Sequence, residues 1–250
     1  MHPHPPILLF DVDGVLLDSR GHFLAALDSM HDRFTNWNYE ILARTTSVDI
    51  IRMFESGAKK RSIPSLATML KNFKELIPNR FRRLVYIAMM GRKIDKYDWQ
   101  FSDFFPGTEE TLRYLRSKGI ILGAASNSHR DRIAKWFKLK NVDDLFPLFI
   151  SRDVRKTYGV KPSPVPLLAL LVKIKKYYHF PKIDRNRVAF IGDLITDVQA
   201  AQRAKIKSIA VLSGHSARGE LEFHNPDYII PDINSIPQIL PKLFPDDKFE

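Results

Sequence analysis

Short apolar runs alternate with amphipathic stretches at the start of the chain and again after residue 105. The first run, residues 7–10, is continuous and ends abruptly at Asp11. A continuous apolar run that ends in polar residues is typical of a buried strand in a parallel sheet. Further runs of this kind cover residues 119–125, 148–150, 188–191, 208–212 and 228–230. We expect each of them to form a strand.

Stretches with helical spacing separate these runs. They cover about residues 108–118, 130–138, 165–178, 197–204 and 235–240. Gly119 stands where the first of these helices would end in a glycine cap. Regular alternation of strand and helix favours parallel strands joined by helical crossovers. The predicted fold class is therefore α/β, with a doubly wound parallel sheet.

Residues 19–104 interrupt the alternation. They contain no clear strand pattern, but apolar residues recur at helical spacing within residues 23–34 and 66–76. We therefore predict an all-helical cap domain at residues 19–104, inserted after the first strand of an α/β core domain. The core domain would consist of residues 1–18 and 105–250.

The composition excludes several classes of protein. A chain of 250 residues with 44% hydrophobic and 27% charged residues is expected to fold around a sizeable core. The absence of cysteine excludes disulfides, cysteine zinc sites and thiolate nucleophiles. The most apolar uncharged stretch, residues 162–172, is too short to span a bilayer, and the first residues lack a signal-peptide pattern. We expect no membrane anchor and a cytoplasmic protein.

The charge of the chain points to an anionic partner. The 39 Lys and Arg outnumber the 28 Asp and Glu, which gives a formal net charge of +11, and more than half of the surplus lies in the predicted cap. Nucleic acid, a membrane surface and a phosphorylated small molecule would all fit this charge. We interpret the basic residues of the cap as a solvated helix face, and the apolar run at residues 84–90 as cap core. The basic residues in question are Arg52, Lys59, Lys60, Arg61, Arg92, Lys93 and Lys96.

Polar side chains with complementary chemistry follow three of the predicted strands. In open α/β sheets the ligand lies outside the carboxyl ends of the strands. The residues at this edge, with one lysine that precedes a predicted helix, are Asp11, Asp13, Ser126, Asn127, Lys161, Asp193 and Asp197. Converging carboxylates repel one another unless a cation lies among them, and ligands that are all oxygen favour Mg²⁺. Because a hydroxyl, an amide and a lysine can hold phosphoryl oxygens, the set predicts phosphoryl transfer.

The sequence resembles the haloacid dehalogenase (HAD) superfamily of hydrolases, and within it the phosphoglycolate-phosphatase-like branch with a helical cap after the first strand. The four family motifs are matched in order by residues 11–19 (DVDGVLLDS), 125–127 (ASN), 160–164 (VKPSP) and 192–197 (GDLITD). Each motif alone is weakly specific, but all four occur in order at suitable strand ends. The resemblance implies a HAD-like Rossmannoid core.

The resemblance also implies a role for each matched residue. Asp11 would be the nucleophile that forms an aspartyl-phosphate, and Asp13 would be the general acid and then the general base. Ser126 and Asn127 would bind the phosphoryl group. Lys161 would balance the negative charge of the nucleophile and the phosphate.

The same resemblance implies the ligands of Mg²⁺. Asp11, Asp193 and the backbone carbonyl of Asp13 would hold the ion, and Asp197 would support the site directly or through a water. Family dehalogenases lack a carboxylate at the position of Asp13, so its presence favours a phosphatase or a phosphomutase. We expect Asp18, the last carboxylate of the first motif, to be structural.

Each of these residues, taken alone, also has a structural interpretation. Asp11 and Asp13 could end a strand in a turn. Ser126 and Asn127 could cap a helix, Lys161 could be a solvated loop residue, and Asp197 could interact with a helix dipole. The combination of motifs favours the catalytic interpretation.

The preferred function is a Mg²⁺-dependent phosphatase that acts on a small phosphorylated metabolite, such as a phosphoglycolate-like compound or a sugar or nucleotide monophosphate. One alternative is a phosphomutase of the β-phosphoglucomutase type. It is disfavoured because Phe23 stands where such enzymes carry a cap histidine, and His22 is one position away. An alternative of another class is a non-catalytic polyanion-binding protein. Since no nucleic-acid-binding pattern is present, we keep nucleic acid only as a disfavoured alternative partner.

Overall fold

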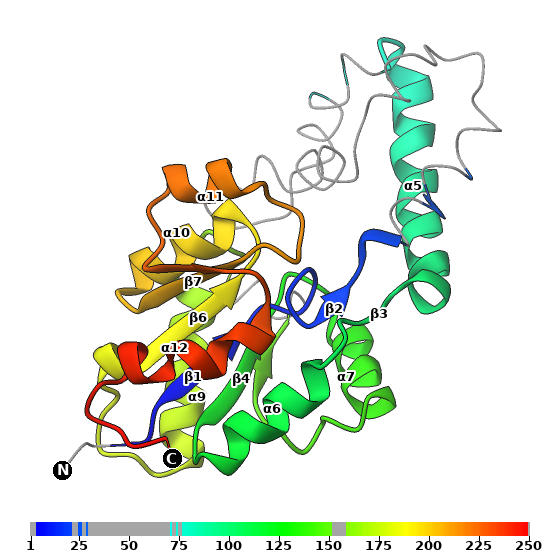
Figure 1. Ribbon diagram of the computed structural model, residues 1–250. Helices are drawn as coiled ribbons and strands as arrows, with labels where there is room; N and C mark the ends of the chain where they lie inside the picture. Colours follow the sequence, from blue (N-terminus) through cyan, green and yellow to red (C-terminus); the bar gives the residue numbers. More distant parts are fainter. Residues whose placement is uncertain are drawn as a thin grey trace. The chain divides into compact units, whose positions relative to one another are not determined.

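The computed structural model describes residues 4–21, 25–26, 29, 71, 74, 77–151 and 159–249. The chain divides into two compact units (Figure 1). One consists of Met1–Leu17 and Phe104–Glu250, and the other of Asp18–Asp103. The sequence predicts boundaries after residues 18 and 104. The description of the second unit as an all-helical cap stays a prediction, because much of it lies outside the described residues.

Six parallel strands form the sheet of the first unit, in the order β5-β4-β1-β6-β7-β8. Their bounds are β1 (Ile7–Phe10), β4 (Ile121–Ala125), β5 (Phe149–Ile150), β6 (Val188–Gly192), β7 (Lys207–Val211) and β8 (Tyr228–Ile230). Each strand falls on a predicted apolar run. On the central strand β1, Phe10 pairs with Ala124 of β4 on one side and with Ile191 of β6 on the other. The predicted parallel α/β sheet is confirmed.

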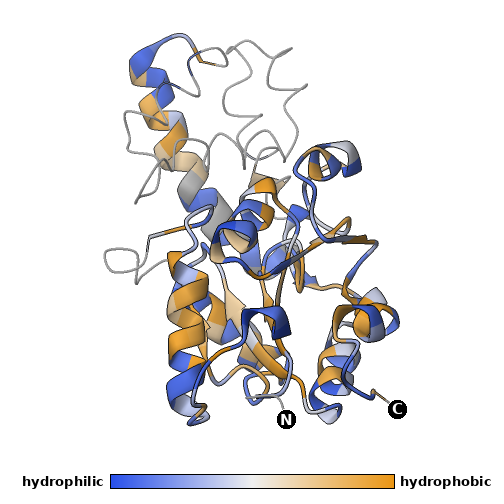
Figure 2. Cartoon of the chain, turned by 90° about the vertical axis from the view of Figure 1, so that its left-hand side faces the viewer, coloured by the Kyte–Doolittle hydropathy of each residue, from blue (hydrophilic) through white to orange (hydrophobic). Residues whose placement is uncertain are grey.

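Helices cover both faces of this sheet. Their bounds are α6 (Thr108–Ser117), α7 (Arg130–Leu139), α9 (Val165–Tyr177), α10 (Ile195–Ala204), α11 (Arg218–Phe223) and α12 (Ile236–Leu243), with short 3₁₀ turns at Arg185–Arg187 and Ile233–Ser235. Helices α6, α7 and α12 contribute to the hydrophobic cluster on one face, and α9 and α10 contribute to the cluster on the other. Figure 2 shows that these helices carry both hydrophobic and hydrophilic residues. The arrangement is the doubly wound fold predicted from the sequence.

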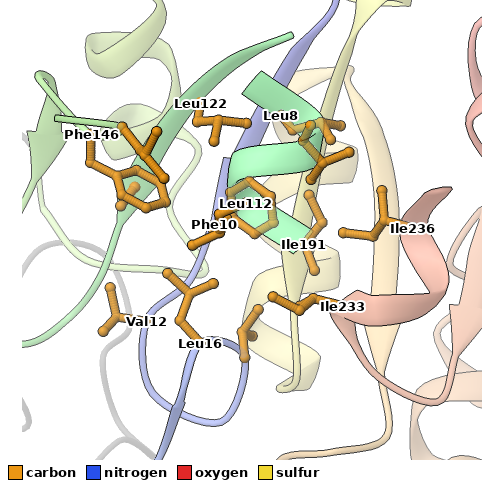
Figure 3. Packing of buried hydrophobic residues seen from close by; sticks show 14 of the residues in the cluster. Leu8, Phe10, Val12, Leu16, Leu112, Leu122, Phe146, Ile191, Ile233 and Ile236 are labelled. Atoms are coloured by element: carbon orange, nitrogen blue, oxygen red, sulfur yellow. The ribbon is translucent and has the colours of Figure 1, made fainter. Parts of the chain in front are cut away.

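The two clusters divide the residues of β1 by their position along the strand. Leu8 and Phe10 belong to the cluster with α6, α7 and α12, whereas Ile7 and Leu9 belong to the cluster with α9 and α10. This division follows from the two-residue period of a strand. Figure 3 shows Leu8 and Phe10 among residues from several elements of the first cluster. Burial on both faces explains why β1 is a continuous apolar run rather than an alternating one.

In the second unit the longest described helix is α5 (Arg80–Phe101). Asn79 caps its first turn, where the backbone N–H of Arg82 donates to Asn79 Oδ1 at 3.0 Å. Tyr86, Ile87 and Met90 are buried, as predicted for the run at residues 84–90, whereas Leu84 is 38% exposed and Ala88 is also exposed. The prediction was therefore wrong for Leu84 and Ala88, because a helix buries only part of its circumference.

Two short strands, β2 (Leu17–Asp18) and β3 (Asp103–Phe104), pair where the chain passes between the two units. Neither was expected, because two residues are too few to show a strand period. Asp18, the last residue of β2, accepts hydrogen bonds from the guanidinium of Arg20 at 2.9 and 2.7 Å. This pairing agrees with the structural role predicted for Asp18.

Several sequence predictions fall outside the described residues. They concern His22, Phe23, most of the expected helices at residues 23–34 and 66–76, and the basic residues Arg52, Lys59, Lys60 and Arg61. On α5, Arg92 and Lys96 are exposed and Lys93 is half-buried. Within the described part of the chain, no helix has the length and apolar character needed to cross a membrane.

Candidate active site

The carboxyl end of β1 lies at the point where the order of the strands reverses. The chain runs from β1 to β4 and β5 on one side, and then crosses to β6, β7 and β8 on the other. Asp11 follows β1, Ser126 follows β4 and Asp193 follows β6. The N–H of Asp11 donates to the carbonyl of Ile191 at 2.8 Å, so the backbone after β1 stays attached to β6. Ligands of open α/β sheets bind at such a point.

Three of the predicted carboxylates converge at this edge. Asp11, Asp193 and Asp197 each offer a carboxylate oxygen, and these oxygens lie within 4.8 Å of one another. The three residues are 5%, 0% and 1% exposed. Three buried carboxylates at this separation require positive charge nearby.

Lys161 supplies part of that charge. Its Nζ lies 2.8 Å from Asp11 Oδ2 and 2.6 Å from Asp197 Oδ1, and the residue is 3% exposed. The backbone N–H of Lys161 donates to Asn127 Oδ1 at 3.3 Å, which ties the loop before α9 to the end of β4. Lys161 is therefore a buried site residue and not a solvated loop lysine.

The electrostatics show that one lysine does not neutralise the cluster. Burial raises the pKa of Asp11 well above its ordinary value; Lys161 opposes this shift, and Asp197 and Asp193 add to it. Burial also raises the pKa of Asp197, against the effect of Lys161. Although burial alone lowers the pKa of Lys161, Asp11 and Asp197 raise it overall. Lys161 therefore stays positively charged, but its single charge does not offset the negative charge of three buried carboxylates.

The two oxygens of Asp193 have different surroundings. Oδ2 accepts from the backbone N–H of His215 at 2.8 Å and lies 2.8 Å from His215 Nδ1. Oδ1 is buried and accepts no hydrogen bond among the described residues. An anionic oxygen without a donor is costly to bury unless a cation binds it. The carboxylate therefore fits a metal ligand.

Two glycines make room for Asp193. A Cβ at Gly14 would lie 2.2 Å from Asp193 Oδ2, and a Cβ at Gly214 would lie 2.1 Å from the same atom. Gly14 also has a φ of +77°, which disfavours other residues. The loops after β1 and β7 thus approach this carboxylate so closely that neither glycine position has room for a side chain.

Asp197 lies in the first turn of α10, and its two oxygens have separate partners. Oδ2 accepts from the backbone N–H of Leu194 at 3.0 Å, and Oδ1 lies against Lys161. The structural interpretation of Asp197 as a residue of the first helical turn is therefore correct, and it is compatible with a place in the site.

The predicted phosphate-binding residues follow β4. Ser126 is 6% exposed, and its Oγ accepts from the N–H of Ser128 at 3.0 Å. Asn127 is half-buried beside Lys161. The N-cap position of α7 belongs to His129. Ser126 and Asn127 therefore lie at the same sheet edge as the carboxylates, but they do not occupy the helix cap itself.

Asp13 lies apart from the three converging carboxylates. Its Oδ2 accepts from Ser128 Oγ at 2.6 Å and from Arg132 Nη1 at 2.9 Å, and Arg132 Nη2 lies 2.9 Å from Oδ1. The side chain of Asp13 is 24% exposed. The carboxylate is thus directed toward α7 and not toward Asp193, which leaves its backbone carbonyl as the group predicted to face the ion.

Four residues that touch the site carboxylates escaped the sequence prediction. They are Ser128, Arg132, Gly214 and His215. Gly214 and His215 follow β7, so their place at a strand end was a usable signal. Arg132 lies in the first turn of α7 and Ser128 precedes the N-cap His129, so no regular helical spacing in the sequence indicated that the two side chains meet.

Comparisons with known proteins agree with this geometry. The family model described as haloacid dehalogenase-like hydrolase matches residues 8–211. The chain is 24% identical over 240 residues to a phosphoglycolate phosphatase of Nitrosococcus oceani, covering 96% of this chain and 98% of that protein. It is 23% identical over 230 residues to a pyrophosphatase of Oceanobacillus iheyensis, covering 92% and 94%.

Solved structures share the fold. A hydrolase from Pseudomonas syringae matches with a TM-score of 0.67 at 23% identity, over 95% of this chain and 98% of that chain. A protein from Thermotoga maritima described as a β-phosphoglucomutase matches with a TM-score of 0.67 at 18% identity, over 95% and 99%. At these identities the likeness concerns the fold alone.

Proposed function

Because the chain belongs to the family of haloacid dehalogenase-like hydrolases, we propose that it is a Mg²⁺-dependent phosphatase that acts on a small phosphorylated metabolite. The observation that carries the proposal is the buried group of Asp11, Asp193 and Asp197 around Lys161 at the carboxyl edge of the sheet. Similarity to phosphatases over nearly the whole chain supports it.

The residues at this edge fit a Mg²⁺ ion. All candidate ligands are oxygens, and Asp193 Oδ1 is a buried acceptor without a donor among the described residues. We assign the ion to Asp11, Asp193 and the backbone carbonyl of Asp13, with Asp197 as a supporting group. When bound, the ion would offset the negative charge of the carboxylates and of the phosphoryl oxygens.

In the first step of the proposed reaction, a carboxylate oxygen of Asp11 attacks phosphorus. A bond forms between this oxygen and phosphorus, the bond to the leaving oxygen breaks, and an alkoxide leaving group takes a proton from Asp13. Ser126, Asn127 and Lys161 hold the phosphoryl oxygens during the transfer. Lys161 stays charged beside Asp11, which limits repulsion between the nucleophile and the phosphate.

In the second step, water hydrolyses the aspartyl-phosphate. The water oxygen bonds to phosphorus, its proton passes to Asp13, and the bond from Asp11 to phosphorus breaks. Inorganic phosphate leaves, and the Asp11 carboxylate is restored. Two steps let one carboxylate serve repeatedly with water as the final acceptor.

The test is the replacement Asp11→Asn, assayed for Mg²⁺-dependent release of phosphate from an aryl phosphate. We expect a loss of at least about a thousandfold, because an amide does not replace the nucleophile. Asp144→Asn is the matched control, since Asp144 is an exposed carboxylate of the same unit whose side chain is 63% exposed. Activity retained by Asp11→Asn would contradict the mechanism.

A substrate panel then identifies the metabolite. It should contain phosphoglycolate, pyrophosphate, sugar phosphates and nucleoside monophosphates, each with and without Mg²⁺. Conversion of a hexose phosphate to its isomer without release of phosphate would instead indicate a phosphomutase. Salt-dependent binding of nucleic acid without any turnover would favour the polyanion-binding alternative.

A further inference from the structure

We infer that Arg132 and Ser128 are positioning residues that hold the Asp13 carboxylate where it takes a proton from the attacking water. The inference rests on the proposed function and concerns one half of the reaction. It assigns a role to two residues outside the four sequence motifs, both at the start of α7.

The geometry around Asp13 is specific. The guanidinium of Arg132 spans the carboxylate, with Nη1 2.9 Å from Oδ2 and Nη2 2.9 Å from Oδ1. Ser128 Oγ donates to Oδ2 at 2.6 Å, and Arg132 Nη1 also lies 3.1 Å from Ser128 Oγ. A paired guanidinium and carboxylate fix both the plane and the direction of the carboxylate. A lysine would supply the charge without this orientation.

The pair lies where the site is partly open and not in the closed core. The side chains of Arg132 and Asp13 are 17% and 24% exposed, so a water can approach the carboxylate that Arg132 holds. The neighbouring Arg130 on the same helix lies over the ring of Phe149, 4.6 Å from its centroid. The start of α7 therefore presents one arginine to an aromatic ring and the other to the proposed acid and base.

The water step depends on Asp13 with every substrate. Nitrophenol is acidic enough to leave as the nitrophenolate anion. The first step with 4-nitrophenyl phosphate therefore does not need a proton from Asp13. The water that attacks the aspartyl-phosphate must lose a proton as its oxygen bonds to phosphorus and the bond to Asp11 breaks. A change in the position of Asp13 should therefore slow the second step selectively.

The experiment is steady-state and burst kinetics of Arg132→Ala and Ser128→Ala with 4-nitrophenyl phosphate and Mg²⁺. The ratio kcat/KM includes the steps up to release of nitrophenol, whereas kcat also includes the water step. For Arg132→Ala we expect kcat to fall about tenfold or more, with kcat/KM within about twofold of the wild type, since a positioned base contributes about 10² to 10⁴. The KM should fall with kcat, and a burst of close to one nitrophenol per site should appear.

Ser128→Ala should show the same pattern with a smaller fall in kcat. Arg130→Ala is the matched control, because it removes the same charge from the same helix without touching the carboxylate contacts described above. Added guanidinium ion should restore part of kcat in Arg132→Ala, and added sodium ion at equal concentration should not.

Equal losses of kcat and kcat/KM in Arg132→Ala, or no loss of either, would overturn the inference. So would the same kinetic pattern in Arg130→Ala. These results leave the proposed function intact as long as the wild type turns over and Asp11→Asn does not. A wild type without phosphatase activity would overturn the proposed function, and the inference with it.

Discussion

His215 is the residue that gives the two oxygens of Asp193 their different surroundings. Its backbone N–H and its ring both contact Oδ2, while Oδ1 accepts no hydrogen bond in the described structure. The backbone at Gly14 and at Gly214 also lies so close to the same carboxylate that a side chain at either position would clash with it. Groups that orient a metal ligand in this way commonly contribute to metal affinity as well as to geometry. His215 should therefore affect the binding of the ion without contacting it.

We predict that His215→Ala weakens the binding of Mg²⁺ by about ten- to a hundredfold. The physical reason is the loss of the side-chain partner that fixes Asp193. The measurement is the rise in Tm as a function of Mg²⁺ concentration, since weaker binding shifts this curve to proportionally higher Mg²⁺. Mn²⁺ titration followed by magnetic resonance provides a second readout. His224→Ala serves as the control, because His224 lies at the end of α11 and contacts Phe223. An unchanged dependence of Tm on Mg²⁺ in His215→Ala would argue against this role.

At the scale of elements, the helices matter because their starts set the positions of site residues. Lys161 precedes α9, Asp197 lies in the first turn of α10, and Ser128 and Arg132 flank the start of α7. Each helix is anchored to the sheet by apolar residues farther along its length. On α9, Leu170 is completely buried, and a Cβ on Gly123 of β4 would lie 3.3 Å from its side chain. The packing of α9 on β4 therefore contributes to the position of Lys161.

We predict that Leu170→Ala lowers the free energy of unfolding by about 2 to 5 kcal/mol, because it removes buried methyl groups and leaves a cavity. Val172→Ala on the same helix should change it by less than about 0.5 kcal/mol, since Val172 is 66% exposed. Urea unfolding followed by circular dichroism measures both. A similar loss in the two variants would show that α9 does not pack as described.

At the scale of the whole molecule, a positively charged chain contains a negatively charged centre. The formal net charge is +11, yet the buried edge of the sheet holds three carboxylates and one lysine. The surplus positive charge does not compensate these carboxylates, because buried charge is offset only by groups in close contact. The stability of the metal-free protein should therefore depend on pH and on Mg²⁺ together.

The direction of this dependence follows from the raised pKa values of Asp11 and Asp197. A carboxyl whose pKa is raised by folding stabilises the folded state below the ordinary aspartate pKa of about 3.9, and this contribution is lost as the pH rises through the folded pKa. In the metal-free protein, the contribution of Asp11 and Asp197 to the free energy of unfolding should therefore fall as the pH rises from about 3.9 through their raised pKa values.

Mg²⁺ should reverse this loss, because it binds the ionised carboxylates and releases their protons. We predict that the rise in Tm caused by Mg²⁺ is larger near pH 8 than near pH 5. At a Mg²⁺ concentration about a hundred times the Kd, the ion would raise the free energy of unfolding by about 2.7 kcal/mol. Thermal unfolding with and without chelator tests this, and Asp193→Asn should flatten the response. A rise in Tm that is equal at both pH values would contradict the prediction.

The fold was predictable from the sequence where elements are long or buried. The runs at residues 7–10 and 188–191 became strands because burial on both faces demands continuous apolar residues. The strands β2 and β3 were missed because their two residues each show no period. The exposure of Leu84 was missed because a continuous apolar run does not reveal which side of a helix meets the core.

The site was predictable in its residues but not in its contacts. Asp11, Ser126 and Asp193 could be assigned to one sheet edge, because the carboxyl ends of parallel strands share it. The pairing of Asp13 with Arg132 joins residues 119 positions apart. Such a contact depends on the direction in which α7 leaves the sheet, and no local pattern encodes that direction.

The sequence by itself determined the parallel sheet, the order of the four motifs and the identity of the residues at the sheet edge. These features depend on local patterns of apolar and polar positions, which are readable along the chain. Only the tertiary structure decided that Lys161 contacts both Asp11 and Asp197, that His215 contacts Asp193, and that Asp13 faces α7. The physical reason is that ion pairs and hydrogen bonds act over a few ångströms in space, between groups that the fold brings together from distant parts of the chain.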